Sequence, residues 1–154
     1  MSAEAKIKEL NLELPPVGKP LGAYQPIVIS GNMAYLSGHG PIQPDGSFAK
    51  GRVGENMTKE QGYDAARRTA LAIMATLRDK LGSLDKVERI VKVVGMVNST
   101  PDFYEQPAVI NGCSELLREV FGEDHGVAAR SAFGVAALPA GWVVEIEAIV
   151  GIKA

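Results

Sequence analysis

Apolar residues recur every three or four positions between residues 58 and 81, and this period predicts a long amphipathic helix. Thr58 and Gln61 fit a capping box at its start, and Gly82 supplies a residue that ends helices in the left-handed conformation. The same spacing predicts a second helix further along the chain. It should begin near Pro107, because proline is tolerated in the first turn of a helix and disrupts the interior. Its apolar stripe consists of Ile110, Cys113, Leu117, Val120 and Phe121.

Shorter apolar runs predict the strands of a sheet. Residues 27–29 and 33–36 flank the turn-forming residues 30–32 and predict a hairpin, and residues 90–97 are rich in the β-branched side chains of a buried strand. Residues 131–138 and 142–150 predict the last two strands, which we expect to be neighbours in the sheet. The order of strands, helix, strand, helix and strands predicts an α+β fold, a mixed sheet with the two main helices on one face.

Composition narrows the class of protein. With 154 residues, 46% hydrophobic and 22% charged, the chain is long enough for one domain with a core that needs no disulfide, and its single cysteine, Cys113, has no partner for one. A net charge of −2 gives no general attraction to nucleic acid or anionic membranes. The first residues lack the continuous apolar run of a signal peptide. We therefore expect a cytoplasmic protein that binds neither nucleic acid nor membrane.

Strong catalytic motifs are missing from the sequence. It has no phosphate-binding glycine loop followed by lysine, no zinc-type spacing of cysteine and histidine, and no nucleophile elbow. His39 and His125 are the only histidines, so we expect no metal site. His39 stands among glycines, which favours a solvated loop residue over a catalytic one.

One placement of charge is unusual. Glu145 and Glu147 share a face of an otherwise apolar terminal strand, and Arg130 directly precedes the strand predicted beside it. In one interpretation this face meets solvent and the charges form weak exposed pairs. In the other it closes against another subunit, where Arg130 is a partly buried fork for a carboxylate and Glu145 holds a water or moves a proton. Composition and periodicity leave both open.

Several segments resemble the RidA/YjgF family of reactive-intermediate (enamine/imine) deaminases. The resemblance extends from about residue 20 to residue 150, so residues 1–19 form an N-terminal extension and residues 20–154 a RidA-like domain. The segments that match are Gly22-Ala23-Tyr24, Gly31-Asn32, Leu36-Ser37-Gly38, Ala129-Arg130-Ser131, Ala137-Leu138-Pro139 and residues 144–148. Residues 97–100 and 111–114 indicate a longer subgroup of this family.

The resemblance implies a chorismate-mutase-like fold assembled as a homotrimer. The sheets would form an inner barrel, with ligand clefts between subunits. The residue matching Arg130 binds the substrate carboxylate in this family, and the one matching Glu145 positions the attacking water. Tyr24, Ser37 and Gly38 match residues that line the cleft. No cofactor is implied.

The implied activity is hydrolysis of 2-aminoacrylate-type enamines and imines to 2-keto acids and ammonia. The alternative is a regulatory protein that binds a small carboxylate such as a 2-keto acid without catalysis. A ribonuclease is a third interpretation, against which the acidic composition argues. Two residues depart from the family pattern at positions that bear on the substrate: Ala132 stands where cysteine is common, and His39 where glutamine is frequent.

Overall fold

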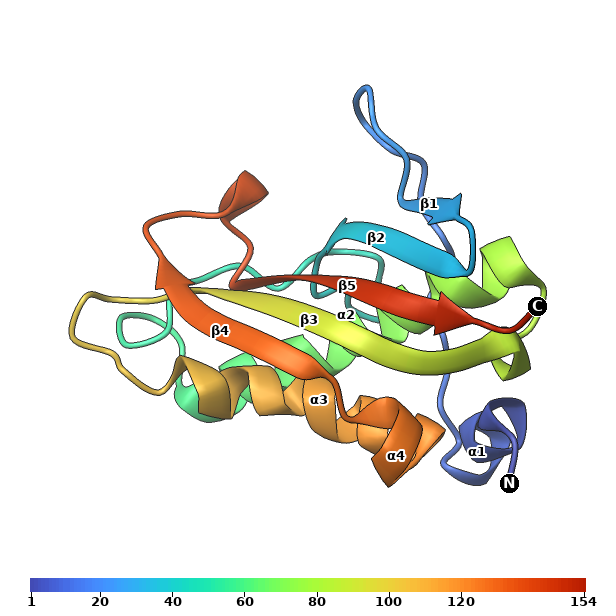
Figure 1. Cartoon of the computed structure of the whole chain (residues 1–154). Coiled ribbons are helices and arrows are strands. Elements are labelled where there is room, and N and C mark those ends of the chain that lie inside the picture. Colours follow the sequence, from blue (N-terminus) through green and yellow to red (C-terminus); the bar gives the residue numbers. More distant parts are fainter.

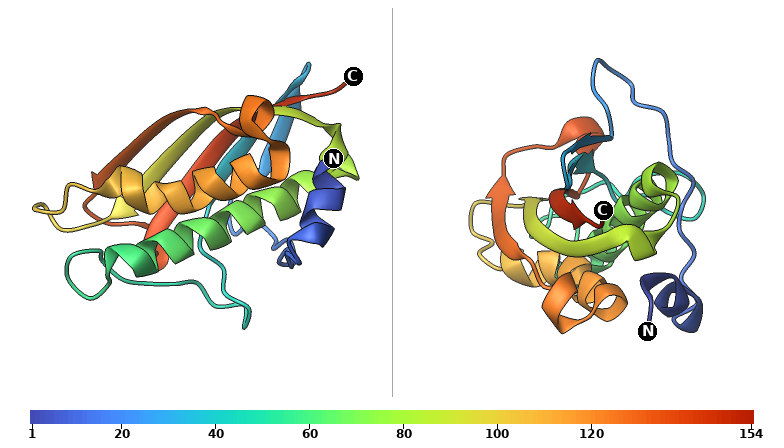
Figure 2. Two further views of the ribbon diagram at one scale, coloured as in Figure 1. Left: turned by 90° about the horizontal axis from the view of Figure 1, so that it is seen from below. Right: turned by 45° about the vertical axis from the view of Figure 1, so that its right-hand side comes forward.

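Five strands form one mixed sheet in the order β1-β2-β5-β3-β4, and two long helices cover only one of its faces (Figures 1 and 2). The computed structural model describes residues 1–154. The strands are β1 (Ile27–Ser30), β2 (Met33–His39), β3 (Val87–Asn98), β4 (Ala129–Val135) and β5 (Val144–Ile152). The helices are α1 (Ala3–Glu9), α2 (Lys59–Leu81), α3 (Gln106–Phe121) and α4 (Glu123–Gly126), with short 3-10 turns η1 (Leu84–Lys86) and η2 (Pro139–Gly141). The α+β prediction is confirmed.

Local signals set the ends of the two main helices. The Thr58 hydroxyl accepts a hydrogen bond from the backbone N–H of Gln61, whose side chain accepts one from the Thr58 N–H, so the predicted capping box forms at the start of α2. Gly82 ends this helix with φ at 85°, which favours glycine. Helix α3 begins at Gln106, which places Pro107 in the first turn, where no N–H is needed.

The predicted hairpin and terminal strand are also confirmed. Strands β1 and β2 pair antiparallel around Gly31, and the alternating apolar side chains of β5 face the helices and are buried. Those buried side chains are Val144, Ile146, Ala148 and Val150.

One prediction about the sheet is wrong. The strand expected at residues 131–138 runs from Ala129 to Val135, and it does not pair with β5. It lies parallel to β3, and β3 separates it from β5. The pairing is parallel because helices α3 and α4 cross from the end of β3 back to the start of β4. The segment 136–143 then passes over to β5, so β4 is an edge strand.

The core lies between the sheet and the helices α2 and α3. It contains Ile73 and Leu77 from α2 and Ile110 and Leu117 from α3, all nearly inaccessible to solvent. The two helices approach closely at Gly112, where any Cβ would overlap the backbone carbonyl of Tyr63. Glycine is required here because the contacting atoms belong to the backbone and cannot turn away.

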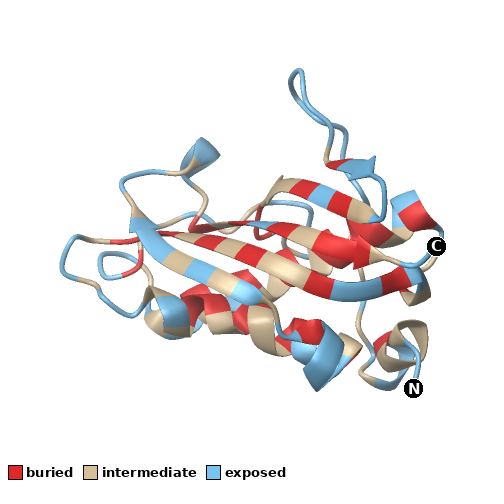
Figure 3. Ribbon diagram, in the orientation of Figure 1, coloured by how far each residue is buried: buried red, intermediate tan, exposed pale blue.

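The second face of the sheet has no covering layer within one chain. Figure 3 shows exposed and intermediate residues alternating with buried ones along these strands. Large apolar side chains on strands β1, β2 and β4 remain accessible, among them Tyr35 (45% exposed) and Phe133 (44% exposed). No helix of the chain is long and apolar enough to cross a membrane.

The N-terminal segment packs against the rest of the fold. Ile7 of α1 is buried in the core, and the Glu4 carboxylate accepts hydrogen bonds from the Arg78 guanidinium at 2.6 and 3.1 Å and from the Leu84 N–H at 2.9 Å. Burial alone would raise the pKa of Glu4, but these hydrogen bonds outweigh it and the pKa is lowered. Helix α1, which ends at Glu9, is therefore fixed to the rest of the fold.

We predict that Gly112→Ala lowers the free energy of unfolding by about 3 kcal/mol, because its methyl group must push two helix backbones apart. Urea denaturation followed by circular dichroism measures the change. Gly18→Ala is the control, since a Cβ there meets nothing within 4 Å. Equal stability of the two variants would show that the helices separate at no cost.

Candidate functional site

Arg130 lies on edge strand β4 and points toward helix α3. Its Nη1 donates hydrogen bonds to Asn111 Oδ1 at 2.8 Å and to Ser114 Oγ at 3.2 Å. Both acceptors are neutral, and no carboxylate forms an ion pair with this half-buried guanidinium. The Nε and Nη2 groups make no hydrogen bond within the chain, so two donors and a full positive charge are available to an anion.

A cavity of about 400 Å³ opens beside Arg130. Helix α3 forms one wall with Asn111, Ser114 and Arg118, and the chain between α4 and β4 forms another with Val127 and Ala128. Its size is within the range of small-molecule sites.

Glu145 lies on the uncovered face of the sheet. Its neighbours Val144 and Ile146 point into the core, so alternation along β5 turns Glu145 the opposite way. Its side chain lies flat on Gly38, where a Cβ would come within 2.5–2.9 Å of the carboxyl group. Burial, and then the negative charge of Glu147, raises the pKa of Glu145. No protein group donates a hydrogen bond to this carboxylate, which leaves it free to hold a water.

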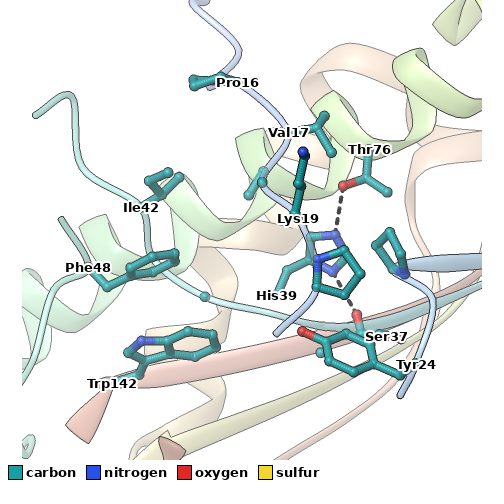
Figure 4. Close-up of a pocket in the computed structure, with 16 residues that line it drawn as sticks. Pro16, Val17, Lys19, Tyr24, Ser37, His39, Ile42, Phe48, Thr76 and Trp142 are labelled. Atoms are coloured by element: carbon teal, nitrogen blue, oxygen red, sulfur yellow. Dashed lines mark hydrogen bonds between the residues drawn. The ribbon is translucent and has the colours of Figure 1, made fainter. Parts of the chain in front are cut away.

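A bulge in strand β2 brings Ser37 and Gly38 to Glu145. The regular pairing of β2 with β5 is interrupted between Leu36 and His39, so these two residues leave the ladder. The Ser37 hydroxyl donates to the carbonyl of Gln25 at 2.6 Å, and the half-exposed Tyr24 lies beside it (Figure 4). Tyr24, Ser37 and Gly38 line one pocket, and Gly38 lies against Glu145; these four residues are called the cluster around Glu145 below.

His39 is not a solvated loop residue, and that prediction is wrong. It ends β2 and is partly buried, with Nδ1 at 2.6 Å from the Ser37 carbonyl and Nε2 at 2.8 Å from Thr76 Oγ1 (Figure 4). A carbonyl only accepts, so Nδ1 carries the proton and Nε2 accepts from the threonine hydroxyl. Burial lowers the pKa of His39, and the neutral ring fastens the bulge to helix α2.

Within one chain the two predicted catalytic residues do not meet. Arg130 points to the helix-covered side of the sheet, whereas Glu145 lies on the other side with Gly38. The roles of Asn111 and Ser114 as partners of Arg130 were missed, because nothing in their local pattern indicates a strand 16 or 19 residues away.

Other candidates have structural roles. Cys113, on the apolar stripe of α3, is fully buried, which raises the pKa of its thiol to about 12. Trp142 stacks on Phe48 with ring centroids 4.8 Å apart. No three His, Cys, Asp or Glu side chains lie close enough together to hold a metal ion.

Comparisons with known proteins point to one family. The model of the family described as "YjgF/chorismate mutase-like, putative endoribonuclease" matches residues 4–145. Protein TCP17 of Trypanosoma cruzi is 41% identical over 146 residues, covering 95% of this chain and 91% of that protein. A RutC family protein of Pyrococcus abyssi is 33% identical over 132 residues, covering 85% and 87% respectively.

Solved structures show the same fold. Protein Atu1372 of Agrobacterium tumefaciens, whose function is unknown, has a TM-score of 0.88 and 39% identity, and the match covers 99% of this chain and 92% of that one. A "putative endoribonuclease" from Shewanella oneidensis has a TM-score of 0.94 and 28% identity, covering 99% and 100%.

The lowered pKa of His39 predicts a loss of stability in acid. The unfolded chain takes up this proton near pH 6.5, whereas the folded chain does so only at lower pH. The contribution of the neutral His39 ring to the free energy of unfolding is therefore fully present above pH 6.5. This contribution is lost as the pH falls through the folded pKa. Thermal melts between about pH 7.5 and about pH 5 should show a larger decrease for the wild type than for His39→Gln, whose amide cannot titrate. Identical pH slopes would contradict this account of the imidazole.

Proposed function

The chain belongs to the YjgF/chorismate mutase-like family, and on this premise we propose that it is a deaminase of small enamine and imine acids. Its substrates would be of the 2-aminoacrylate type and its products 2-keto acids and ammonia. The observation that supports this most is the guanidinium of Arg130, which is half-buried beside a cavity, held by neutral acceptors and paired with no carboxylate. A carboxylate is the ligand that such a fork binds best.

Arg130 would orient the substrate. Asn111 and Ser114 hold Nη1, which leaves the Nε–Nη2 edge for two parallel hydrogen bonds to a carboxylate. Fixing one end of a small molecule in this way places its reactive carbon at a set distance from the other groups of the site.

Glu145 would act on water. The enamine first gains a proton at carbon and becomes an imine, and water then adds to the carbon of the C=N bond. The resulting carbinolamine loses ammonia and leaves the keto group. A carboxylate with a raised pKa suits the proton transfers, because it can take a proton from water and return it to the departing nitrogen. Every atom comes from the substrate and water, so the reaction needs no cofactor.

The complete site would form between two copies of the chain. Arg130 and the cluster around Glu145 lie on opposite sides of one sheet, so a second copy must supply the missing half. The accessible apolar residues of the uncovered face, such as Tyr35 and Phe133, give such an assembly a surface to bury. We propose a homotrimer in which each cleft takes Arg130 from one protomer and Glu145 from the next.

A regulatory protein that binds a 2-keto acid without catalysis is the alternative. Both proposals predict saturable binding of 2-oxobutanoate at Arg130, but only the enzyme also turns over an enamine acid. A deaminase loses turnover and keeps this binding in Glu145→Gln. We do not propose a nuclease, because the net charge of −2 provides no general attraction to RNA. The cytoplasmic location remains a prediction.

Arg130→Ala should lower kcat/KM for 2-aminoacrylate, generated in a coupled assay, by about a hundredfold or more, since two charge-assisted hydrogen bonds are lost. Arg130→Lys keeps the charge without the fork and should lie between alanine and wild type. Arg68→Ala is the matched control, because Arg68 pairs with Asp64 on the exposed side of α2. Full activity of Arg130→Ala would end the proposal.

Mixing two inactive variants tests the shared site. After Arg130→Ala and Glu145→Gln chains are unfolded and refolded together in equal amounts, about a quarter of the clefts in a cyclic trimer combine both native residues. We therefore expect about a quarter of wild-type activity to return. Mixtures that stay inactive, although mass spectrometry shows mixed assemblies, would refute a cleft shared between protomers.

A further inference from the structure

A second cavity, of about 140 Å³, has Tyr24 and Ser37 in its lining (Figure 4). Tyr24, Ser37 and Gly38 form one side of it, and these are the residues assigned above to the substrate cleft. Ala72 and Thr76 of helix α2 form the floor. The remaining walls come from the N-terminal segment Pro16–Pro20 and from a group of apolar side chains, Ile42, Phe48 and Trp142.

The N-terminal wall is held in place from both sides. On one side, Ile7 is buried in the core and Glu4 binds Arg78 and the Leu84 N–H, so the start of the chain is fixed. On the other side, strand β1 begins at Ile27. Between them, the prolines at positions 15, 16 and 20 restrict the backbone, which lowers the entropy lost when the segment orders. The wall therefore lies between two anchored parts of the chain.

The interior of this cavity is mostly apolar. Phe48 and Trp142 stack with an interplanar angle of 18°, and Trp142 also lies on Gly40, where a Cβ would come within 2.7–2.9 Å of the indole. His39 uses both ring nitrogens for Ser37 and Thr76 and is neutral. Lys19, which is exposed, is the one charged side chain of the lining.

The volume matches one six-membered ring. An apolar cavity of roughly 150 Å³ in another protein holds a benzene molecule. A 2-aminoacrylate-type substrate has only a methylene group at this position and would leave the cavity unfilled. An aromatic ring would fill it and bury its apolar surface among these side chains.

We propose that this cavity is a side-chain subsite, walled by the N-terminal segment, that selects 2-imino acids with an aromatic side chain. The inference deepens the proposed function and rests on it, because the shared residues Tyr24, Ser37 and Gly38 connect the cavity to the cleft. Carboxylate and imine would lie toward Arg130 and Glu145, and the ring beneath residues 16–20.

Binding of two stable keto acids tests the subsite without any turnover. Phenylpyruvate carries a ring and 2-oxobutanoate does not, while both have the same carboxylate and ketone. Calorimetry on the wild type should show phenylpyruvate binding about tenfold tighter or more, from burial of the ring. Ala72→Leu fills the floor of the cavity from a helix that tolerates leucine, and should abolish this preference while leaving the 2-oxobutanoate affinity within about twofold.

Ala72→Ser, which adds one oxygen atom, is the matched control and should keep the preference. Equal affinity of the wild type for both keto acids, or an equal loss of both in Ala72→Leu, would overturn the subsite. The two proposals fail separately. If the protein turns over an enamine acid but binds both keto acids equally, only the subsite is refuted. If it prefers phenylpyruvate, Ala72→Leu abolishes that preference and no imine is turned over, only the deaminase is refuted.

Discussion

A single layer of helices covers one face of a five-stranded sheet, and the positions of the candidate residues follow from this constraint. Because side chains alternate across a strand, residues next to each other in the sequence point to opposite faces. Strand β5 sends Val144 and Ile146 into the core and Glu145 outward, whereas β4 sends Arg130 toward helix α3. One chain therefore presents the two parts of the proposed site on opposite sides of its sheet.

The electrostatics of the two halves are complementary. Arg130 is a cation without an anion, held by an amide and a hydroxyl that leave its charge unneutralised. Glu145 is a carboxylate without a hydrogen-bond donor, and its surroundings raise its pKa. Both arrangements cost stability in an isolated chain, because a partly buried charge without an opposite charge loses hydration that neutral neighbours replace only in part. Such a cost is typical of groups kept for a ligand.

The surroundings of Glu145 depend on a chain of supporting contacts. Gly38 lets the carboxylate lie against the backbone, the bulge at residues 37–38 places that glycine, and His39 ties the bulge to Thr76 on α2. Each contact joins a different element, so the geometry near Glu145 is coupled to the packing of the long helix. The N-terminal segment adds a further layer over the same helix, which links the start of the chain to the candidate cleft.

Local patterns in the sequence determined the elements and the faces they bury. The apolar period, the capping box at Thr58 and the glycine at position 82 define α2, and alternation alone places Glu145 away from the core. The placement of charge singled out Arg130 and Glu145 but left two interpretations of them open. The resemblance to a known family was needed to choose between these interpretations and to single out Tyr24, Ser37 and Gly38, because isolated residues of these types have no distinctive spacing.

Only the tertiary structure decided which distant residues meet. The pairing of β4 with β3, the hydrogen bonds of Arg130 to α3, the burial of His39 and the wall made by residues 16–20 all join segments far apart in the chain. Such contacts depend on how the packed layers fit together, and a periodic pattern records only whether a side chain is buried, not which neighbour buries it.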